Sequence, residues 1–563
     1  MIQVRNLTFS YDDVAVLQDI SVDLEFGQSV AILGPNGSGK STFLRCLNGL
    51  LQPDGGDVLV DGLSTANAAL VADIRRRVGL LFQNPDEQIV SALVDSDIAF
   101  GLENLGYPHE EIVSRVDEAL VRFQLQTHRN RSTHALSGGE RQRLALAGVW
   151  AMRPRFLLLD EPTALLDPKA GLESLDLLFA LPGDGVTPVI VTHEADAAAR
   201  ADRVIVLREG RIVEDGPSGA VLSNASRLTL HGLDTTLPAR VARRLGQVDP
   251  LPVTAIDLVQ TLSATPTHPV THPPRACTTT STAIDSSELR HIYNEGLPDQ
   301  TVALDGVSLT VHDGETVAVV GPSGSGKSTF ALHLNGLLFA TGGRLSVFGR
   351  AVTPNLSSSA ALELRREVGL IFQFPETQLF AETVSRDIAF GPENLGMNDV
   401  ERLVDRALDE VGLASATYGD RDPLTLSGGE KRRVAIAGVL VTKPRLVVLD
   451  EPTAALDPAA AADFDELLAR LKADGVTLIM ITHDLDRASR MCDRIIAFTD
   501  GRVAFAEPPS SAFEDRDRLS ALGLVPPQVL RLADDLRAAG CPIPLDAITE
   551  DHLVAALGGH STV

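Results

Sequence analysis

The chain contains 563 residues, more than a single hydrophobic core usually organises, so its length predicts two or more domains. Apolar residues make up 44% and charged residues 22% of the chain, which is typical of folded globular proteins and excludes a largely disordered chain. The formal net charge of −26 repels phosphate backbones, so nucleic acid is not expected as a partner.

The N-terminal segment, MIQVRNLTFSYDD, lacks the charged and then apolar pattern of a signal peptide. No apolar run along the chain approaches the roughly 20 residues that cross a bilayer. The cysteines are scattered without paired spacing, which argues against a disulfide framework or a zinc site and indicates a reducing compartment. We therefore expect any membrane role to be played through another chain.

The same motifs occur twice along the chain at a constant offset of 290 positions, as Gln83 and Gln373 or His193 and His483 illustrate. A constant offset over this distance indicates a duplicated domain. The likeness continues near Gly232 and Gly523, which predicts a small helical tail on each copy. A stretch rich in Pro, Thr and Ser between the copies is typical of a linker. The predicted organisation is a first domain at 1–222, its tail at 223–262, a linker at 263–285, a second domain at 286–508 and its tail at 509–563.

Each copy contains short apolar runs with the length of buried parallel strands. They are VAILG, FLLLDEP, PVIVTH and RVIVLREG in the first copy, and VAVVG, LVVLDEP, LIMITH and RIIAFTD in the second. Helical patterns lie between several of these runs. The predicted fold class is therefore α/β, with functional residues at the carboxyl ends of the strands.

A glycine-rich loop follows the first of these strands in each copy and matches the pattern G-x-x-x-x-G-K-[ST]. Such a loop points backbone N–H groups and a helix N-terminus at phosphates, while its lysine reaches the β and γ oxygens and its serine offers a hydroxyl to Mg²⁺. The alternative, a glycine-rich turn that caps a helix, is weakened by two matches in register. The predicted phosphate-binding residues are Gly34, Pro35, Asn36, Gly37, Ser38, Gly39, Lys40, Ser41 and Thr42, with Gly321, Pro322, Ser323, Gly324, Ser325, Gly326, Lys327, Ser328 and Thr329.

Acidic residues end another apolar run in each copy. Asp160 and Asp450 are expected to lie near the metal, and Glu161 and Glu451, one residue further, to accept a proton from the attacking water. The alternative is an ordinary strand end, which the recurrence of the pattern weakens.

His193 and His483 follow a further strand, where an imidazole could contact the γ-phosphate. A histidine at a strand end is usually structural, so this role depends on the motifs around it.

The segments LSGGERQR and LSGGEKRR, which start at Leu136 and Leu426, resemble a second phosphate-binding device. A serine and two glycines that lead into a helix present a hydroxyl and unhindered N–H groups at a positive helix end. Alone they would indicate only a capped helix start. The predicted residues are Ser137, Gly138 and Gly139, with Ser427, Gly428 and Gly429.

Taken together, these motifs resemble the ATP-binding subunits of ABC transporters along both copies. The resemblance implies two P-loop ATPase domains packed head to tail, so that Lys40 and its partners face Ser427 and Gly429, and Lys327 and its partners face Ser137 and Gly139. It implies that Gln83 and Gln373 contact Mg²⁺ and the attacking water, and that Tyr11 and Tyr293 stack on adenine. The D-loops, ALLD from Ala164 and AALD from Ala454, lack the serine of the common SALD. Both catalytic glutamates are present, which implies two hydrolytic sites.

The stretches that begin at Phe82 and Phe372, with their shared D-I-A-F-G-x-E-N-L-G, resemble the ATPases of energy-coupling-factor (ECF) importers for vitamins and transition metals. This resemblance implies a separate transmembrane scaffold (T-type) and a membrane-embedded substrate-binding subunit, with the chain as a peripheral ATPase at the cytoplasmic face of the membrane. Nearby carboxylates are expected to receive arginines from the scaffold, although a solvated acidic face would look the same. They are Asp86, Glu87, Asp97, Glu103, Glu376, Asp387 and Glu393.

Two other functions are compatible with the general motifs. One is a fused ATPase for a conventional importer, although such fusions often have a damaged second phosphate loop and Gly321–Ser328 is intact. The other is a soluble tandem protein acting on the ribosome or on DNA, against which the acidic charge and the Pro- and Thr-rich linker argue.

Overall fold

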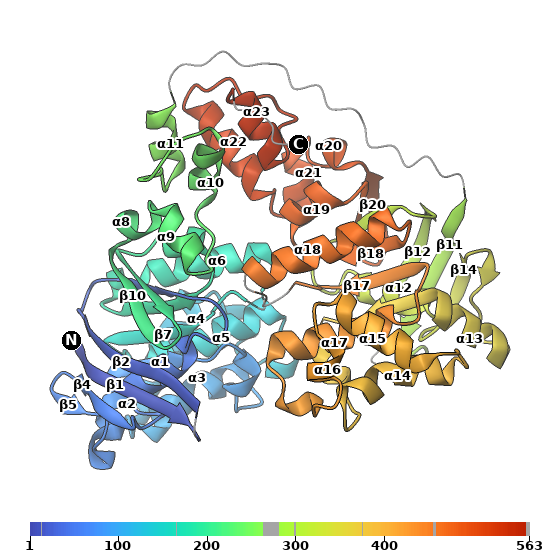
Figure 1. Ribbon diagram of the computed structural model, residues 1–563. Helices are drawn as coiled ribbons and strands as arrows, with labels where there is room; N and C mark the ends of the chain where they lie inside the picture. Colours follow the sequence, from blue (N-terminus) through green and yellow to red (C-terminus); the bar gives the residue numbers. More distant parts are fainter. Residues whose placement is uncertain are drawn as a thin grey trace.

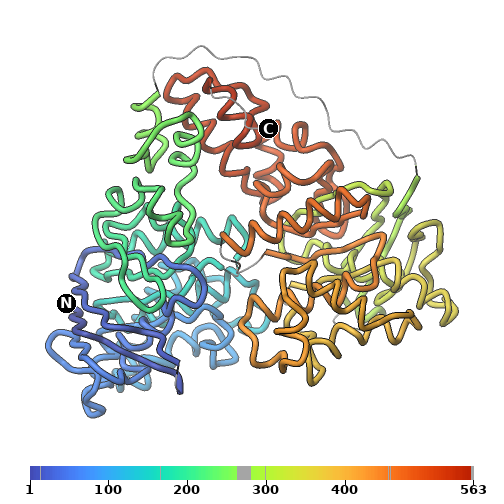
Figure 2. The backbone as a smooth tube through the Cα atoms, in the orientation of Figure 1, coloured from blue at the N-terminus to red at the C-terminus, as the bar shows by residue number. Residues whose placement is uncertain are grey.

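The computed structural model describes residues 1–12, 14–164, 166–262, 281–297, 300–373, 375–453, 456 and 458–558. The molecule consists of two α/β halves that lie side by side, with the first half blue to green and the second yellow to red (Figure 1). The C-terminal helical tails of the two halves meet at the top of the view (Figures 1 and 2). The tandem arrangement expected from the repeat is confirmed.

Each half is built on a six-stranded sheet of five parallel strands and one antiparallel edge strand. The strands expected from the apolar runs are buried members of these sheets, which confirms the α/β prediction. In the first half the order is β10-β9-β3-β8-β7-β6, formed by β3 (Val30–Leu33), β6 (Val78–Leu81), β7 (Phe156–Asp160), β8 (Thr187–Thr192), β9 (Arg203–Arg208) and β10 (Arg211–Pro217). In the second half the order is β16-β17-β18-β13-β19-β20, formed by β13 (Thr316–Val320), β16 (Val368–Ile371), β17 (Leu446–Asp450), β18 (Thr477–Ile481), β19 (Arg494–Thr499) and β20 (Arg502–Glu507).

A four-stranded antiparallel sheet accompanies each parallel sheet, and the sequence patterns did not predict it. Its strands alternate buried and exposed residues, because only one face packs on the core. The strands are β1 (Ile2–Tyr11), β2 (Val14–Leu24), β4 (Gly55–Val60) and β5 (Leu63–Ser64), then β11 (Thr282–Tyr293), β12 (Thr301–His312), β14 (Gly342–Val347) and β15 (Arg350–Ala351). The two sheets of each half enclose one core, around Phe43 and Phe156 in the first half and Phe330 and Phe498 in the second.

Helices cover the sheets, and three in each half pack together into a helical subdomain, α3–α5 and α14, α15 and α17. The first-half helices are α1 (Lys40–Leu47), α2 (Val71–Arg77), α3 (Val94–Asn104), α4 (His109–Arg122), α5 (Gly138–Ala151), α6 (Pro168–Phe179) and α7 (Ala195–Ala198). The second-half helices are α12 (Lys327–Leu334), α13 (Ser358–Glu367), α14 (Val384–Asn394), α15 (Val400–Glu410), α16 (Ser415–Tyr418), α17 (Gly428–Leu440), α18 (Pro458–Ala473) and α19 (Leu485–Met491).

The two tails share one hydrophobic core, which we call the tail core. Residues of α10 and α11, such as Val241 and Leu258, pack there with residues of α22 and α23, such as Leu536 and Leu553. Arg240 Nε lies 3.2 Å from Glu550 Oε2, and Arg244 pairs with Glu550 and Asp551, so ion pairs also join the halves. The tail helices are α8 (Ser218–Leu222), α9 (Ala225–Leu230), α10 (Leu237–Arg244), α11 (Ala255–Thr261), α20 (Pro509–Ala512), α21 (Arg516–Ala521), α22 (Gln528–Ala538) and α23 (Glu550–Ala556).

The second half begins earlier than the expected boundary at residue 286. Strand β11 starts at Thr282, and Ile284 and Asp285 pair with both β12 and β14. Thr and Ala next to the Pro-rich stretch suggested a linker by composition, but here they begin a strand. Residues 263–280 of the expected linker lie outside the described residues. Within the described part of the chain, no helix is both long and apolar enough to cross a membrane.

Candidate nucleotide-binding sites

The first predicted phosphate loop joins the carboxyl end of β3 to α1. Gly39 stands at the helix start with a φ of 98°, and a Cβ there would lie 2.8 Å from Leu17 Cδ2, so this position requires glycine. Lys40 is buried, and its Nζ donates to Gly34 O at 2.7 Å and to Pro35 O at 2.9 Å. The loop therefore curls around the ammonium group, and its N–H groups and a helix N-terminus can face phosphates.

The second phosphate loop has the same geometry between β13 and α12. Gly326 has a φ of 99°, and a Cβ there would lie 2.3 Å from Ala303 O. Lys327 Nζ donates to Gly321 O and Pro322 O, both at 2.8 Å. Burial lowers the pKa of Lys327. The strand, loop and helix context expected for both motifs is confirmed.

A serine hydroxyl and a carboxylate meet beside each loop. Ser41 Oγ donates to Asp160 Oδ1 at 2.9 Å, because β7 ends near the start of α1. Burial raises the pKa of Asp160 and Asp450, and hydrogen bonds from Ser41 and Ser328 act in the opposite direction. Hydroxyl and carboxylate oxygens suit Mg²⁺, which usually takes its remaining ligands from water and substrate phosphates. The pair in each half fits that cation.

Glu161, the glutamate predicted to be catalytic in the first half, contacts the two residues predicted to accompany it. Gln83 Nε2 donates to Glu161 Oε2 at 3.1 Å, and His193 Nδ1 lies 3.5 Å from Glu161 Oε1. Burial acts to lower the pKa of His193, but the hydrogen bond and charge of Glu161 raise it overall. Gln83, Glu161 and His193 therefore meet at one point, although they are far apart in sequence.

Glu451, the corresponding glutamate of the second half, differs from Glu161 in its electrostatics. His483 Nε2 lies 3.1 Å from Glu451 Oε1. Burial and then the neighbouring Asp450 raise the pKa of Glu451 to about 8. Burial and then the charge of Lys327 lower the pKa of His483 to about 4. The two sites therefore differ in direction: the pKa of the glutamate is raised and that of the histidine lowered in the second site, whereas the pKa of the histidine is raised in the first.

Both signature serines start their helices with a reciprocal cap. Ser137 N donates to Glu140 Oε2 at 2.7 Å, and Glu140 N donates to Ser137 Oγ at 3.3 Å. Ser427 and Glu430 form the same capping box at α17. Among the described residues, no atom lies within 4 Å of where a Cβ would stand at Gly138, Gly428 or Gly429. A capped helix start and a phosphate-binding segment are therefore compatible interpretations, since the cap leaves other N–H groups of the first turn accessible.

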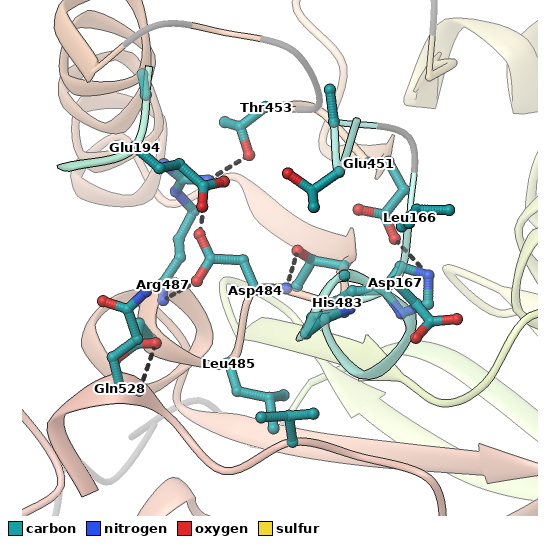
Figure 3. Close-up of a pocket in the computed structure, with 18 of the residues that line it drawn as sticks. Leu166, Asp167, Glu194, Glu451, Thr453, His483, Asp484, Leu485, Arg487 and Gln528 are labelled. Atoms are coloured by element: carbon teal, nitrogen blue, oxygen red, sulfur yellow. Dashed lines mark hydrogen bonds and ion pairs between the residues drawn. The ribbon is translucent and has the colours of Figure 1, made fainter. Parts of the chain in front are cut away.

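One cavity of about 950 Å³ combines residues of both halves. Gly138, Arg141 and Asp167 of the first half line it together with Lys327 and Glu451 of the second half. Figure 3 shows Leu166 and Asp167 on the side of the cavity where Glu451 and His483 lie. The charge of Asp167 also acts to raise the pKa of Lys327 and His483. The signature and D-loop of the first half thus lie opposite the phosphate loop of the second.

The phosphate loop of the first half lines a different cavity, of about 350 Å³. The described lining of that cavity comes from the first half alone: residues 35–38 of the loop, Arg208, Glu209 and residues 229–232 of the tail. Ser427 and Gly429, expected to face this loop, do not line it. The two sites are therefore not equivalent in the structure. In the second D-loop, Ala454, Ala455 and Asp457 lie outside the described residues.

The two tyrosines predicted to stack on adenine both expose part of their rings. Tyr11 packs edge to face on Phe9, with ring centroids 4.9 Å apart. Tyr293 packs edge to face on His291, with ring centroids 4.5 Å apart, and its hydroxyl lies 3.3 Å from Thr329 Oγ1. Each ring therefore has a neighbour that fixes its orientation, and the hydroxyl of Tyr293 also contacts its phosphate loop. The adenine role stays a prediction for both.

Two acidic residues expected to receive arginines from a partner serve the chain itself. Asp97 Oδ1 accepts the N–H groups of Val90 and Ser91, both at 2.9 Å. Asp387 Oδ2 accepts those of Phe380 and Ala381, both at 2.8 Å. These bonds argue against docking at this pair, because one oxygen of each carboxylate already holds the loop before α3 or α14. Asp86 pairs with Arg141 at 3.2 Å, while Glu87, Glu103 and Glu393 are exposed.

Exposed apolar side chains stand beside both glutamine loops, and the sequence reasoning missed them. Val90 is 60% and Phe100 46% exposed in the first half, and Phe380 is 65% and Phe390 52% exposed in the second. The two phenylalanines of the second half pack edge to face with centroids 4.9 Å apart. We call these the loop patches. The sequence signal that could have revealed them is that apolar residues recur at these positions with the same offset of 290.

One further difference between the halves lies inside the signature helices. Gln142 Nε2 donates to Pro162 O at 3.0 Å in the first half. Arg432, at the same position of the second, donates to Pro452 O and, at 3.4 Å, to Gln373 O. The change from ERQR to EKRR was visible in the sequence, but the partners were not. Arg432 thus joins the glutamine loop to the segment after Glu451, a link that Gln142 does not make in the first half.

Known proteins share both halves of this arrangement. The family model for the ABC transporter matches residues 17–164 and 304–454. "Putative ABC transporter ATP-binding protein BL0043" of Bifidobacterium longum (strain NCC 2705) is 36% identical over 543 residues, covering 90% of this chain and 65% of that protein. "Putative ABC transporter ATP-binding protein" of Methanosarcina mazei is 33% identical over 591 residues, covering 100% of this chain and 98% of that protein.

A third relative and a solved structure complete the comparison. "Putative HMP/thiamine import ATP-binding protein YkoD" of Bacillus subtilis (strain 168) is 32% identical over 529 residues, covering 92% of this chain and 93% of that protein. The structure of cbiO1 from Clostridium perfringens, described as part of the ABC transporter complex cbiONQ, is 37% identical with a TM-score of 0.38. It covers 41% of this chain and 94% of that one.

Proposed function

The chain belongs to the ABC transporter family of ATP-binding proteins, and from that premise we propose that it is the energy-coupling subunit of an ECF-type importer for a vitamin or a transition metal. It carries two ABC ATPase domains in one chain. In this proposal the transmembrane T-type scaffold and the substrate-binding membrane subunit are separate chains. The protein works at the cytoplasmic face of the membrane as a peripheral subunit.

The residues of each site divide the work of ATP hydrolysis in this proposal. The phosphate loop and its lysine bind the β and γ phosphates, and the opposed signature of the other half completes the pocket when the halves close. Ser41 with Asp160, and Ser328 with Asp450, hold Mg²⁺, which neutralises phosphate charge when bound. Glu161 and Glu451 accept the proton of the attacking water, which Gln83 and Gln373 orient.

The observation that carries the transport part of the proposal is the pair of loop patches. Monomeric proteins seldom expose repeated bulky apolar groups without using them as a contact surface. The patches lie near the loops of Gln83 and Gln373, so a movement of these loops on nucleotide binding would displace a helix that packs on the patches. We assign this position to cytoplasmic helices of the transmembrane scaffold, which present apolar faces to the patches.

Two further features favour the ECF type over a conventional importer. Helices α3 and α14 and the residues just after them carry the same D-I-A-F-G-x-E-N-L-G sequence pattern, and each half ends in a small helical tail that joins the tail core. A relative with the name of an HMP/thiamine import protein matches over 92% of the chain. The cargo itself need not touch this subunit.

ATP turnover of the full chain tests the assignment of two hydrolytic sites. Glu161→Gln and Glu451→Gln each remove one base, so each is expected to lower Mg²⁺-dependent turnover, and the double variant should lose about a hundredfold or more. Glutamine keeps the size of the side chain, so equilibrium binding of a fluorescent ATP analogue should persist. A single variant with unchanged turnover would contradict two active sites.

Isolation of the tagged chain from solubilised membranes of its host tests the membrane role. Hydrophobic membrane subunits should accompany the parent chain and be lost from the variant Phe100→Asp with Phe390→Asp, whose soluble ATP turnover should persist. Leu545→Asp is the matched control, because Leu545 is 73% exposed but lies in the second tail. Recovery of ribosomes would contradict the proposal, and recovery of an ordinary permease pair would favour a conventional importer.

A further inference from the structure

A carboxylate three residues after each site histidine accepts backbone hydrogen bonds from the helical tail of the same half. Asp196 lies in α7, directly after His193, and Asp486 lies in α19, directly after His483. Asp196 Oδ1 accepts the N–H of Leu237 at 3.3 Å. Asp486 accepts the N–H of Gln528 at 2.8 Å and that of Val529 at 3.3 Å. The residues that donate these bonds are the first residues of α10 and α22, so the two contacts are equivalent in the two halves.

These two tail helices have no cap of their own. Thr236 and Pro527 stand at their N-cap positions, and neither side chain makes a cap hydrogen bond. Four other tail helices are capped locally: α9 by Asn224, α11 by Thr254, α21 by Asp515 and α23 by Thr549. The first N–H groups of a helix need an acceptor. For α10 and α22 the histidine segments provide it.

The same two helices carry the contact between the halves. Val241 and Ala242 of α10 pack in the tail core with Leu532 and Leu536 of α22. Burial raises the pKa of Asp196, while the charges of Arg240 and of Arg531 in the other tail act in the opposite direction. The carboxylate after the first histidine therefore lies near both tails.

One cavity connects the nucleotide site to this junction. Its lining runs from Lys327 and Ser328 past His483 to Asp486, Gln528 and Arg531. Figure 3 shows Gln528 on the side of the cavity where Asp484 and Leu485 follow His483. A displacement of either histidine segment would thus move the aspartate three residues later and, with it, the first turn of a tail helix.

We propose that Asp196 and Asp486 are positioning residues that fix each site histidine to the paired tails, so that closure around ATP and the packing of the tail core are coupled. The inference rests on the proposed ATPase function and on the contact with the γ-phosphate that the sequence predicts for His193 and His483. Coupling of this kind is reciprocal. Tail pairing holds the histidines in place for the reaction, and bound ATP stabilises the first turns of α10 and α22.

Steady-state kinetics of the full chain provide the first test. Asp196→Ala with Asp486→Ala should lower kcat by about tenfold through misplacement of the histidines, without a comparable change in the KM for ATP. The Asn variants keep an acceptor oxygen and should recover most of the turnover. Asp515→Ala is the matched control, because it removes the cap that Arg518 N donates to at 2.9 Å in the same tail but touches no histidine segment. If the Ala variants matched Asp515→Ala, the inference would be wrong.

Hydrogen exchange provides a second test that does not depend on turnover. In the chain with Glu161→Gln and Glu451→Gln, Mg-ATP should slow exchange in peptides that cover Leu237 and Gln528–Val529, and the added Asp→Ala substitutions should abolish this protection. Unchanged exchange on ATP binding would overturn the coupling. A failure of the proposed function is distinguishable, since His193→Ala and His483→Ala would then leave turnover unchanged whatever the exchange shows.

Discussion

The two glutamates predicted to be catalytic share a strained backbone that no sequence pattern displayed. Glu161 has a φ of 44° and Glu451 a φ of 47°. Non-glycine residues seldom adopt this conformation, and it recurs at functional sites where the surrounding structure enforces it. In both halves the backbone N–H of the glutamate donates to the last residues of the neighbouring strand, Val191 O at 3.1 Å and Ile481 O at 2.9 Å. The turn thereby directs the carboxylate toward the histidine.

The raised pKa of Glu451 predicts a pH dependence of stability. Its value of about 8 in the folded chain lies above the ordinary 4.5, so between these pH values the folded state binds a proton that the unfolded state releases. The free energy of unfolding should therefore fall as the pH rises through this window, by about 1.4 kcal/mol for each pH step of one. Glu451→Gln removes the ionisation, so its melting temperature should exceed that of the parent at pH 9 and by less at pH 5.

The control for this experiment is Glu466→Gln, because Glu466 is exposed on α18. It should leave the difference between the two pH values unchanged. Equal gains for Glu451→Gln at pH 9 and pH 5 would contradict the raised pKa.

At the scale of residues, the motifs predicted which side chains lie together in each site, but they did not predict the pKa shifts of those side chains. Lys40, Ser41 and Asp160 were named from spacing alone, because strand ends in a parallel sheet lie together. The opposite pKa shifts of His193 and His483 depend on burial and on charges from other segments. The fold determines both the burial of each histidine and its distance from those charges, and neither can be read from the local sequence.

At the scale of elements, the starts of α3 and α14 depend on one carboxylate each. The pattern of acidic residues was visible, but Asp387 was assigned to the surface because a sequence does not show that a loop turns back onto its own helix. The apolar residues of that loop, Phe380 among them, were overlooked for the same reason. Parallel strands, in contrast, were predicted well, since their continuous apolar runs reflect burial on both faces.

Asp387→Ala should loosen the loop before α14. The substitution leaves the N–H groups of Phe380 and Ala381 without their charged acceptor, and hydrogen bonds to a charged group contribute about 1.5–3 kcal/mol each at most. We expect faster hydrogen exchange in residues 379–387 and a lower melting temperature. Asp387→Asn keeps an acceptor oxygen and should behave nearly as the parent.

The exposed Glu393 on the same helix supplies the matched control, as Glu393→Ala should change neither measurement. If Asp387→Ala and Glu393→Ala behaved alike, Asp387 would be a surface carboxylate after all, and its docking role would return.

At the scale of the whole molecule, duplication was readable from the sequence but the pairing of the tails was not. The likeness between the segments near Gly232 and Gly523 predicted a helical tail on each copy, yet each tail alone is too short to enclose a core. The partner of each apolar face is the other tail. Pairing between segments so far apart in the chain leaves no mark in either one, which is also why the unequal surroundings of the two phosphate loops could not be predicted.

The tail core predicts that the halves stay together when the chain is cut. A protease site inserted within residues 263–280 and then cleaved should yield two pieces that co-elute in size-exclusion chromatography. Leu536→Asp should separate them, because Leu536 is fully buried and a carboxylate would have to lose its hydration in the tail core.

The control for cleavage is the exposed Leu545, since Leu545→Asp should leave the pieces associated. Separation of the unsubstituted pieces at micromolar concentration would show that covalent continuity, rather than the tail core, joins the halves.

The ion pairs of the tails also decide which tail can recognise which. Arg244 of the first tail meets Asp551 of the second. The residue of the second tail that corresponds to Arg244 is Asp535. The residue of the first tail that corresponds to Asp551 is Ile256, since α11 and α23 align at the capping threonines that precede them. Two second tails would set Asp535 against Asp551, and two first tails would set Arg244 against Ile256. At this ion pair only a first tail set against a second tail brings opposite charges together, so charge as well as covalent linkage favours the pairing of unlike tails.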